Sequence, residues 1–323
     1  MNRGTIKTLR TPDIYFKNLP DYNFKSNYVN IPFEGQQLRM HYLDEGDKNA
    51  PETVILLHGQ PSWSYLYRHI IPHLVEAGYR VIAPDLIGFG KSDKLASMDD
   101  VTYNRQEEWL KIALFNELKL RNVTLFAQDW GGLLSLRIVA FYPDYFKRII
   151  VSNTGLPAGG KDSNFTPGDQ PRMFLATLGA KIWQTYAKYF PWYKPGGMAQ
   201  SLTNRKLSKE EVAAYNAPFP NEKYKAVTRK MPSLIPMKAN TPDTKRNWAA
   251  WKALANFDKP FLTAFSDNDM AAKMIPVPTN FQNHVEGAEG IEHITIENAN
   301  HFLQEDQPEA VAKAIIKFIS DTP

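Results

Sequence analysis

The stretch Val-Thr-Leu-Phe-Ala-Gln-Asp-Trp-Gly-Gly-Leu-Leu-Ser-Leu, residues 123–136, changes from a strand pattern to a helix pattern across one acidic residue, Asp129. Residues 123–127 form a short apolar run with β-branched side chains, and the apolar residues at the other end are typical of a buried helix. A strand that turns directly into a helix needs small residues on both sides of the turn, and Ala127 and Gly131 occupy these places. The spacing is typical of a nucleophile elbow, with an aspartate where serine is usual.

An aspartate at this position limits the chemistry of the site. A serine that attacked a saturated carbon would form an ether that could not be hydrolysed, whereas a carboxylate forms an ester that an activated water can open. The carboxylate needs no base for the first step, because it is ionised near pH 7, and the N–H groups of the following helix favour negative charge there. The pattern therefore favours displacement at a saturated carbon. The alternative is an ordinary aspartate at a helix N-cap.

Composition narrows the class of protein. A chain of 323 residues that is 43% hydrophobic can form one α/β domain with an insertion, or two domains. A formal charge of +4 without a long cluster of Lys and Arg does not favour nucleic acid as a partner. The absence of cysteine excludes disulfides, thiolate metal sites and cysteine nucleophiles. Because no long apolar run and no signal-type N-terminus occur, we expect a cytoplasmic protein that does not bind membranes.

The rest of the chain alternates between strand and helix patterns, which predicts a parallel, doubly wound α/β sheet. The predicted strands are 28–33 and 37–42 as an edge hairpin, 54–57, 81–83, 123–127, 148–152, 260–265 and 293–296. The predicted helices are 65–77, 103–120, the helix after the elbow, 244–257 and 308–319. Ligands bind at the carboxyl ends of the strands in such sheets, where residues 58–60, Asp85 and Asp129 are expected.

One stretch interrupts this alternation. Residues 157–231 contain scattered Pro, Gly, Tyr and Trp among short helical patterns, with no clear strand. We interpret this stretch as a helical cap inserted between two parts of the core, residues 1–156 and 232–323.

Two further residues complete a candidate triad, which on this fold follows the order nucleophile, acid, histidine. Asp269 follows a predicted strand, and His301 lies between the last predicted strand and the last predicted helix. His301 would deprotonate a water molecule, and Asp269 would orient its ring and stabilise the imidazolium. Asp267 is the alternative acid. His58 also follows a strand, but it is more typical of a residue that supports its loop.

Several long motifs resemble the haloalkane dehalogenases of the α/β-hydrolase superfamily, and most closely the branch that binds halide with two tryptophans. They are His-Gly-Gln-Pro-Ser-Trp-Ser-Tyr-Leu-Tyr-Arg at 58–68, Asp-Leu-Ile-Gly-Phe-Gly-Lys-Ser-Asp at 85–93 and Gln-Asp-Trp-Gly-Gly at 128–132. The similarity extends from residues 9–13 through 217–220 to 300–305, so it covers nearly the whole chain. This resemblance implies an α/β-hydrolase fold with a helical cap.

The resemblance also implies a reaction, in which a haloalkane is hydrolysed to a primary alcohol and a halide ion. Asp129 would form an alkyl ester, His301 would activate water, and Asp269 rather than Asp267 aligns with the acid. The backbone N–H groups of Gln60 and Trp130 would form the oxyanion hole. The implied partners are a small halogenated alkane, water and halide, with no cofactor and no metal, and we expect a monomer.

The halide would be bound by Trp130 and by a tryptophan of the cap. In the family, the cap tryptophan precedes an aromatic residue by three positions and a proline by eight, and Trp183 fits this spacing better than Trp192. An indole N–H suits a halide because it donates a hydrogen bond and cannot lose its proton easily. Simple packing in the core is the alternative role for these tryptophans. The chain departs from the branch at Gln60, where glutamate is usual.

Other functions share parts of this pattern. An epoxide hydrolase has the same aspartate elbow but protonates an alkoxide with cap tyrosines, for which this chain offers Tyr186, Tyr189, Tyr193, Tyr215 and Tyr224. A non-catalytic binding protein on the same fold is the alternative from another class. A fluoroacetate dehalogenase is disfavoured because no arginine follows the nucleophile.

Overall fold

A large sheet forms the centre of the molecule in the computed structural model, which describes residues 5–159, 170–274 and 277–323. Its strands are β2 (Asn27–Phe33), β3 (Gln36–Glu45), β4 (Thr53–Leu57), β5 (Arg80–Pro84), β7 (Val123–Gln128), β8 (Phe146–Ser152), β9 (Phe261–Ser266) and β10 (Ile294–Ile296). They lie in the order β10-β9-β8-β7-β4-β5-β3-β2. Only the β2–β3 and β3–β5 pairs are antiparallel. The predicted parallel α/β sheet is therefore confirmed.

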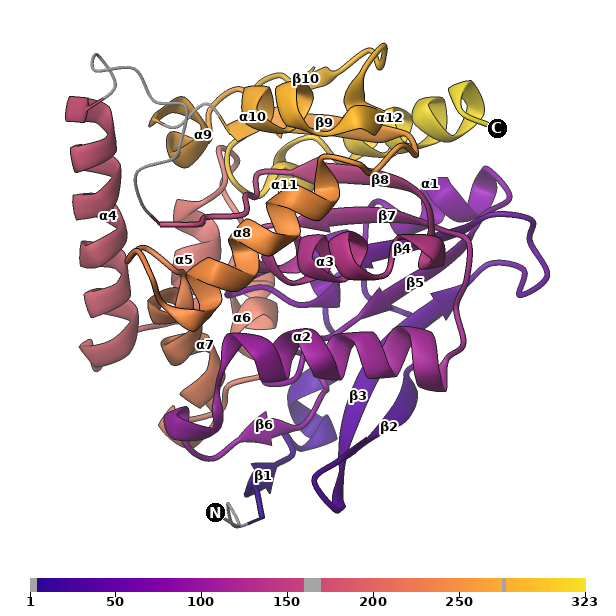
Figure 1. Ribbon diagram of the computed structural model, residues 1–323. Coiled ribbons are helices and arrows are strands. Elements are labelled where there is room, and N and C mark those ends of the chain that lie inside the picture. The colour runs from indigo at the N-terminus through magenta and orange to yellow at the C-terminus, as the bar shows by residue number, and fades with distance from the viewer. Residues whose placement is uncertain (1–4, 160–169, 275–276) are drawn as a thin grey trace.

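Helices cover the sheet because its central strands are apolar on both faces, and every residue of β7 is buried. In Figure 1, α2 (Tyr103–Lys111), α3 (Trp130–Phe141) and α8 (Pro242–Leu254) lie side by side in front of the sheet. Behind it in this view, α1 (Ile71–Glu76) and α12 (Pro308–Asp321) contact each other. Because the strands from β5 to β10 in the sheet order run parallel, their carboxyl ends lie together at one end of the sheet, which carries the candidate site.

The stretch between β8 and α8 is helical in its described part. It contains α4 (Gln170–Tyr189), α5 (Pro195–Ser201), α6 (Lys209–Asn216) and α7 (Ala226–Lys230), which gather at the left of Figure 1. No strand occurs among its described residues. Residues 160–169 of the expected cap lie outside the described residues, as do residues 1–4 of the expected first core segment.

Several local predictions differ from the structure. The expected helix 65–77 is instead a 3-10 turn (Ser64–Tyr67) followed by α1, because Pro72 has no N–H to continue the helical hydrogen bonds across this point. The expected helix 103–120 consists of α2 and a π-helical continuation, Ile112–Glu117. Of the expected edge hairpin, only β2 is an edge strand, since β3 also pairs with β5.

Some short elements were not expected from the sequence. They are β1 (Thr8–Leu9), β6 (Lys94–Leu95), α9 (Met270–Met274), α10 (Val277–His284) and α11 (Leu303–Asp306). β1 and β6 form a separate antiparallel pair. Within the described ranges, no helix has both the length and the apolar character needed to cross a membrane.

Candidate active site

The turn between β7 and α3 presents Asp129 in a strained conformation. Its φ of 51° and ψ of −126° lie in a region that a residue with a side chain seldom adopts. The turn is tight enough that a Cβ added to Gly131 would lie 2.4 Å from the carbonyl oxygen of Leu57. The side chain of Asp129 makes no capping hydrogen bond to α3. The carboxylate therefore does not cap the helix as that of an N-cap aspartate does.

The two oxygens of the Asp129 carboxylate lie in different surroundings. The backbone N–H of Gln60 donates a hydrogen bond to Oδ1 at 2.6 Å, and Oδ2 lies 3.5 Å from Nε2 of His301. Gly59 makes this approach possible, because a Cβ there would lie 2.1 Å from Oδ1. The carboxylate remains 21% exposed, so solvent reaches part of it.

His301 lies between two carboxylates. Its Nδ1 is 2.6 Å from Oδ2 of the buried Asp269, while its Nε2 faces Asp129. Asp267 has a different role, because its Oδ1 accepts a hydrogen bond from the backbone N–H of Ala299 and holds the loop before His301. The structure thus brings together Asp129, His301 and Asp269, and leaves Asp267 outside the group.

The charge state of His301 follows from these neighbours. Burial lowers its pKa, but the charges and hydrogen bonds of Asp269 and Asp129 outweigh burial and raise the pKa of His301 to about 10. The imidazole is therefore held strongly by both carboxylates while both are ionised. Any reaction that neutralised Asp129 would remove one of these two interactions.

Two polar residues near His301 were missed as site residues in the sequence. Gln128 places its Nε2 at 3.0 Å from Nε2 of His301 and donates to the carbonyl oxygen of His301 at 3.1 Å. Asn153 donates to the same carbonyl oxygen at 3.1 Å. Both residues stand at the carboxyl ends of predicted strands, a position that could have marked them, although their partner could not be inferred without the fold.

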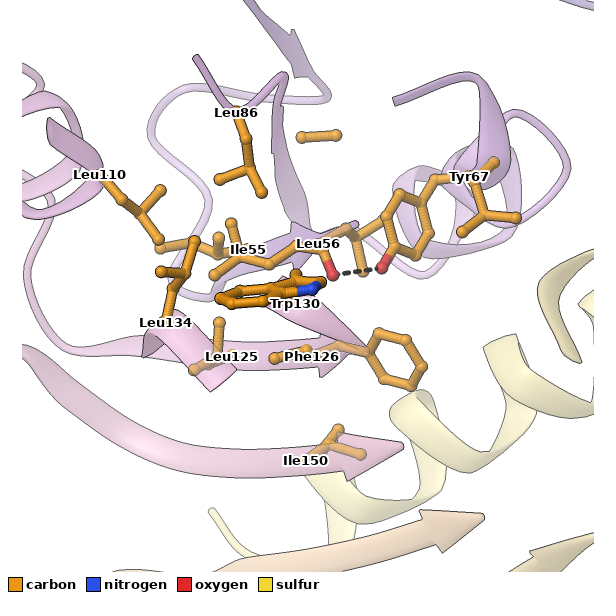
Figure 2. Close-up of a cluster of buried hydrophobic side chains, with 14 of the residues drawn as sticks. Ile55, Leu56, Tyr67, Leu86, Leu110, Leu125, Phe126, Trp130, Leu134 and Ile150 are labelled. Atoms are coloured by element: carbon orange, nitrogen blue, oxygen red, sulfur yellow. Dashed lines mark hydrogen bonds between the residues drawn. The ribbon is translucent and has the colours of Figure 1, made fainter. Parts of the chain in front are cut away.

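Trp130 is the first residue of α3 and is almost fully buried, with 2% exposure. Figure 2 shows its ring within a cluster of buried side chains that includes Leu56 and Leu134. The ring of Tyr103 packs against it with a centroid distance of 5.2 Å. Trp130 directly follows Asp129 in the sequence.

The two cap tryptophans differ in exposure. Trp183 on α4 is half-buried, and its ring centroid lies 6.1 Å from that of the buried Tyr193. Tyr193 in turn accepts a hydrogen bond at 2.8 Å from the side-chain amide of Gln60, the residue whose backbone contacts Asp129. Trp192 is 67% exposed. Trp183 therefore contacts Tyr193 directly, whereas the ring of Trp192 packs against Phe190.

The side chain of Gln60 joins its loop to the cap segment. Its amide donates to Tyr193, and also to the carbonyl oxygen of Thr228 at 2.9 Å. A carboxylate at this position could not donate to that carbonyl group, so the departure from glutamate changes how the loop is anchored.

The cap tyrosines of the epoxide hydrolase alternative are mostly engaged elsewhere. The hydroxyl groups of Tyr193 and Thr228 form a hydrogen bond with each other at 2.8 Å. Tyr215 donates a hydrogen bond to Glu305, and Tyr189 is 67% exposed.

Two other polar residues at the strand ends support the loops. His58 is fully buried, with Nδ1 bonded to the carbonyl oxygen of Gly59 and Nε2 accepting from the N–H of Leu86 at 3.0 Å. Burial lowers the pKa of His58. Asp85 is also fully buried, and although burial opposes ionisation, the neighbouring His41 holds the pKa of Asp85 well below its usual value. The side chains of His58 and Asp85 therefore form hydrogen bonds that hold the neighbouring loops.

Comparison with known proteins supports the arrangement. Residues 52–308 match the model of a family described as alpha/beta hydrolase fold. The chain is 47% identical over 323 residues to a haloalkane dehalogenase of Psychrobacter cryohalolentis, covering 98% of this chain and 100% of that protein. It is 42% identical to a haloalkane dehalogenase of Mycobacterium marinum, covering 97% and 100%.

A solved structure gives the same result. The tetrameric structure of haloalkane dehalogenase DpaA from Paraglaciecola agarilytica NO2 superposes with a TM-score of 0.82 and 33% identity, over 96% of this chain and 97% of that chain. Full-length identity above 40% and a matching fold, together with an aspartate elbow beside a histidine, lead to one conclusion. The chain belongs to the haloalkane dehalogenase family and has the α/β-hydrolase fold.

Proposed function

We propose that this haloalkane dehalogenase uses Asp129 as the nucleophile, His301 as the general base and Asp269 as the acid that orients His301. One observation carries the assignment, namely that Asp129 and Asp269 approach opposite nitrogens of the same imidazole, at 3.5 Å and 2.6 Å. This is the order of contacts that an ester-forming and ester-opening cycle requires.

In the first step, Asp129 displaces the halogen. Oδ1 is already held by the N–H of Gln60, so Oδ2 is the oxygen that attacks the carbon bearing the halogen. A carbon–oxygen bond forms as the carbon–halogen bond breaks, and the halide leaves with the bonding electron pair. The product is an alkyl ester in which Oδ1 is the carbonyl oxygen.

In the second step, water opens the ester. Asp129 no longer carries a charge, so the pKa of His301 falls and its Nε2 can take a proton from water. The hydroxide adds to the ester carbon, and the charge that develops on Oδ1 is stabilised by the backbone N–H groups of Gln60 and Trp130. Loss of one such donor costs about 3 to 4 kcal/mol in comparable sites. The alcohol leaves with the proton from His301, Asp129 loses the remaining water proton to solvent as acid, and the carboxylate is restored.

The leaving halide needs donors of its own. We assign this role to the indole N–H groups of Trp130 and Trp183. The position of Trp130 beside the nucleophile supports the first assignment, and the contact of Trp183 with Tyr193 supports the second. An indole holds an anion without giving up a proton, which suits a halide better than an alkoxide.

The test is to incubate the protein with 1-bromobutane or 1,2-dibromoethane and to measure released bromide and acid. We expect stoichiometric release of both by the natural protein and none by Asp129→Ala, with circular dichroism to verify that the variant folds. Turnover of an epoxide without halide release from any bromoalkane would contradict the proposal and favour the epoxide hydrolase. Release of neither product would indicate a binding protein.

We also propose that the cap is residues 157–231 and that a monomer is the active form, because every group in the proposed mechanism comes from one chain. The DpaA relative is described as a tetramer, so the two proteins would differ in assembly. Light scattering after size-exclusion chromatography measures the mass directly. A tetramer at the concentrations used for catalysis would contradict the monomer.

A further inference from the structure

Gln128, the last residue of β7, makes contacts that the mechanism above does not use. The residue is fully buried, immediately before Asp129. Its amide nitrogen lies 3.0 Å from Nε2 of His301 and donates at 3.1 Å to the carbonyl oxygen of His301. Its carbonyl oxygen Oε1 is buried and has no hydrogen-bond partner among the described residues.

The orientation of this amide follows from its partners. The carbonyl oxygen of His301 can only accept a hydrogen bond, so the NH₂ group of Gln128 must face it. The same NH₂ group then faces Nε2 of His301, and two donors cannot bond each other. A hydrogen bond between them forms only when Nε2 carries no proton and accepts, with the ring proton on Nδ1, where Asp269 accepts it. The contact with Gln128 therefore opposes the charged ring that the two carboxylates favour. This orientation leaves Oε1 buried without a hydrogen bond, which is energetically unfavourable.

We propose that Gln128 is a positioning residue, whose amide N–H favours the neutral ring of His301 with Nε2 free of a proton, ready to act as the base in ester hydrolysis. The inference rests on the proposed function, since it concerns the second step of that cycle. While Asp129 is an ester and no water is bound, the amide of Gln128 opposes protonation of His301 at Nε2. The water that enters for hydrolysis then shares or replaces the hydrogen bond of Gln128 to Nε2.

The charged groups that face His301 act in the opposite direction. They are Asp129 from the turn after β7 and Asp269 from the turn after β9, and both stabilise the imidazolium. Glu305, on α11 close behind His301, bonds Arg68 instead. Once Asp129 is esterified, Asp269 alone favours the charged ring, and the amide of Gln128 is the group placed to counter it.

Gln128→Met and Gln128→Glu test the inference, because the first removes the donor at similar size and the second places an acceptor at Nε2. The measurement is single-turnover rapid quench with 1-bromobutane, which follows bromide release and butanol release separately as functions of pH. We expect the apparent pKa of butanol release to rise by about one unit in Gln128→Met, the size expected for losing one hydrogen bond to one protonation state. It should rise further in Gln128→Glu.

Below the apparent pKa, butanol release by Gln128→Met should be slower by about tenfold, and it should approach the natural rate at higher pH. Asn153→Ala is the matched control. It removes the other donor to the carbonyl oxygen of His301 without touching Nε2, so it should scale the rate equally at every pH.

The inference is overturned if Gln128→Met lowers the rate of butanol release by the same factor at every pH and leaves its apparent pKa unchanged. Gln128 would then only anchor the loop. If bromide is released normally while the profile is unshifted, only the role of Gln128 is wrong. If neither the natural protein nor any variant releases bromide, the proposed function itself is wrong.

Discussion

At the scale of single residues, the proposed cycle divides the work of His301 unequally between the two steps. Displacement of the halogen needs only the ionised carboxylate, whereas opening the ester needs the base. We therefore expect His301→Phe to release one equivalent of bromide per active site and then stop, with the alkyl group trapped on Asp129. Mass spectrometry of the active-site peptide measures the ester.

The control for this experiment is Asp129→Ala, which should show neither the burst nor the adduct. Continued turnover by His301→Phe would mean that another group activates the water. A variant that folds but forms no ester would remove Asp129 from the role of nucleophile.

The halide assignment leads to a second residue-scale prediction. If Trp183 binds the departing ion, bromide should quench its fluorescence, and Trp183→Phe should weaken both quenching at the site and bromide affinity. Trp192→Phe is the matched control, because Trp192 is 67% exposed and its ring packs against Phe190. If quenching is instead lost in Trp192→Phe and kept in Trp183→Phe, Trp192 is the tryptophan that binds the halide.

Sequence reasoning was strongest for the residues that a motif fixes and weakest for those that only the fold brings together. Asp129 could be singled out because a strand-to-helix turn demands small neighbours on both sides. The approach of Gln128 and Asn153 to His301 depends on how three separate strand ends converge, with sequence separations above 100 residues. No local pattern encodes such a contact.

At the scale of elements, a buried ion cluster joins α11 to the loop after β4 and to the cap segment. Arg68 binds Glu305 at 2.5 Å and Glu211 at 2.8 Å, and Arg205 and Tyr215 also bond Glu305. Of the cluster, Glu305 lies on α11, the helix that begins just after His301, so these bonds hold the end of the loop that carries the base.

Glu305→Gln should therefore destabilise the protein by about 3 to 5 kcal/mol at neutral pH, because it leaves the buried Arg68 without its main counter-charge. Burial raises the pKa of Glu305, but the hydrogen bond and charge of Arg68 lower it further than burial raises it. A carboxylate with a depressed pKa adds stability above its unfolded value near 4.5, and this stability is lost as the pH falls through the folded value.

The difference in free energy of unfolding between the natural protein and Glu305→Gln should thus shrink as the pH falls below about 4.5. Urea unfolding at several pH values measures it. Glu292→Gln is the control, since its pair with Lys317 is at the surface and should matter little. If the difference in free energy of unfolding stays constant with pH, the ion pair of Glu305 with Arg68 is not the cause of the lost stability.

The sequence predicted the long elements of the sheet, because buried parallel strands have continuous apolar runs that are distinct from their surroundings. It failed at α1 and at the helix α10, where short elements have too few residues to show a period. The break before α1 depends on Pro72 and on complete burial of the preceding 3-10 turn, which hides any amphipathic pattern.

At the scale of the whole molecule, the question is whether the proposed cap and the core unfold together. A chain of this length exceeds the size at which a single transition is the usual behaviour. However, the two parts are joined by hydrogen bonds from several separate elements, including Trp63 to Ala214 and Phe302 to Leu202. These contacts and the Arg68 cluster make separate unfolding of the cap costly.

We therefore expect scanning calorimetry to show one transition, with the calorimetric enthalpy equal to the van't Hoff enthalpy. Glu305→Gln should lower the transition temperature and, because it weakens the joint between the parts, should be the variant in which a second transition first becomes visible. Two resolved transitions in the natural protein would show that the cap is an independent unit. The Gln60 and Arg68 contacts would then serve to position the cap over Asp129 without determining whether the fold holds together.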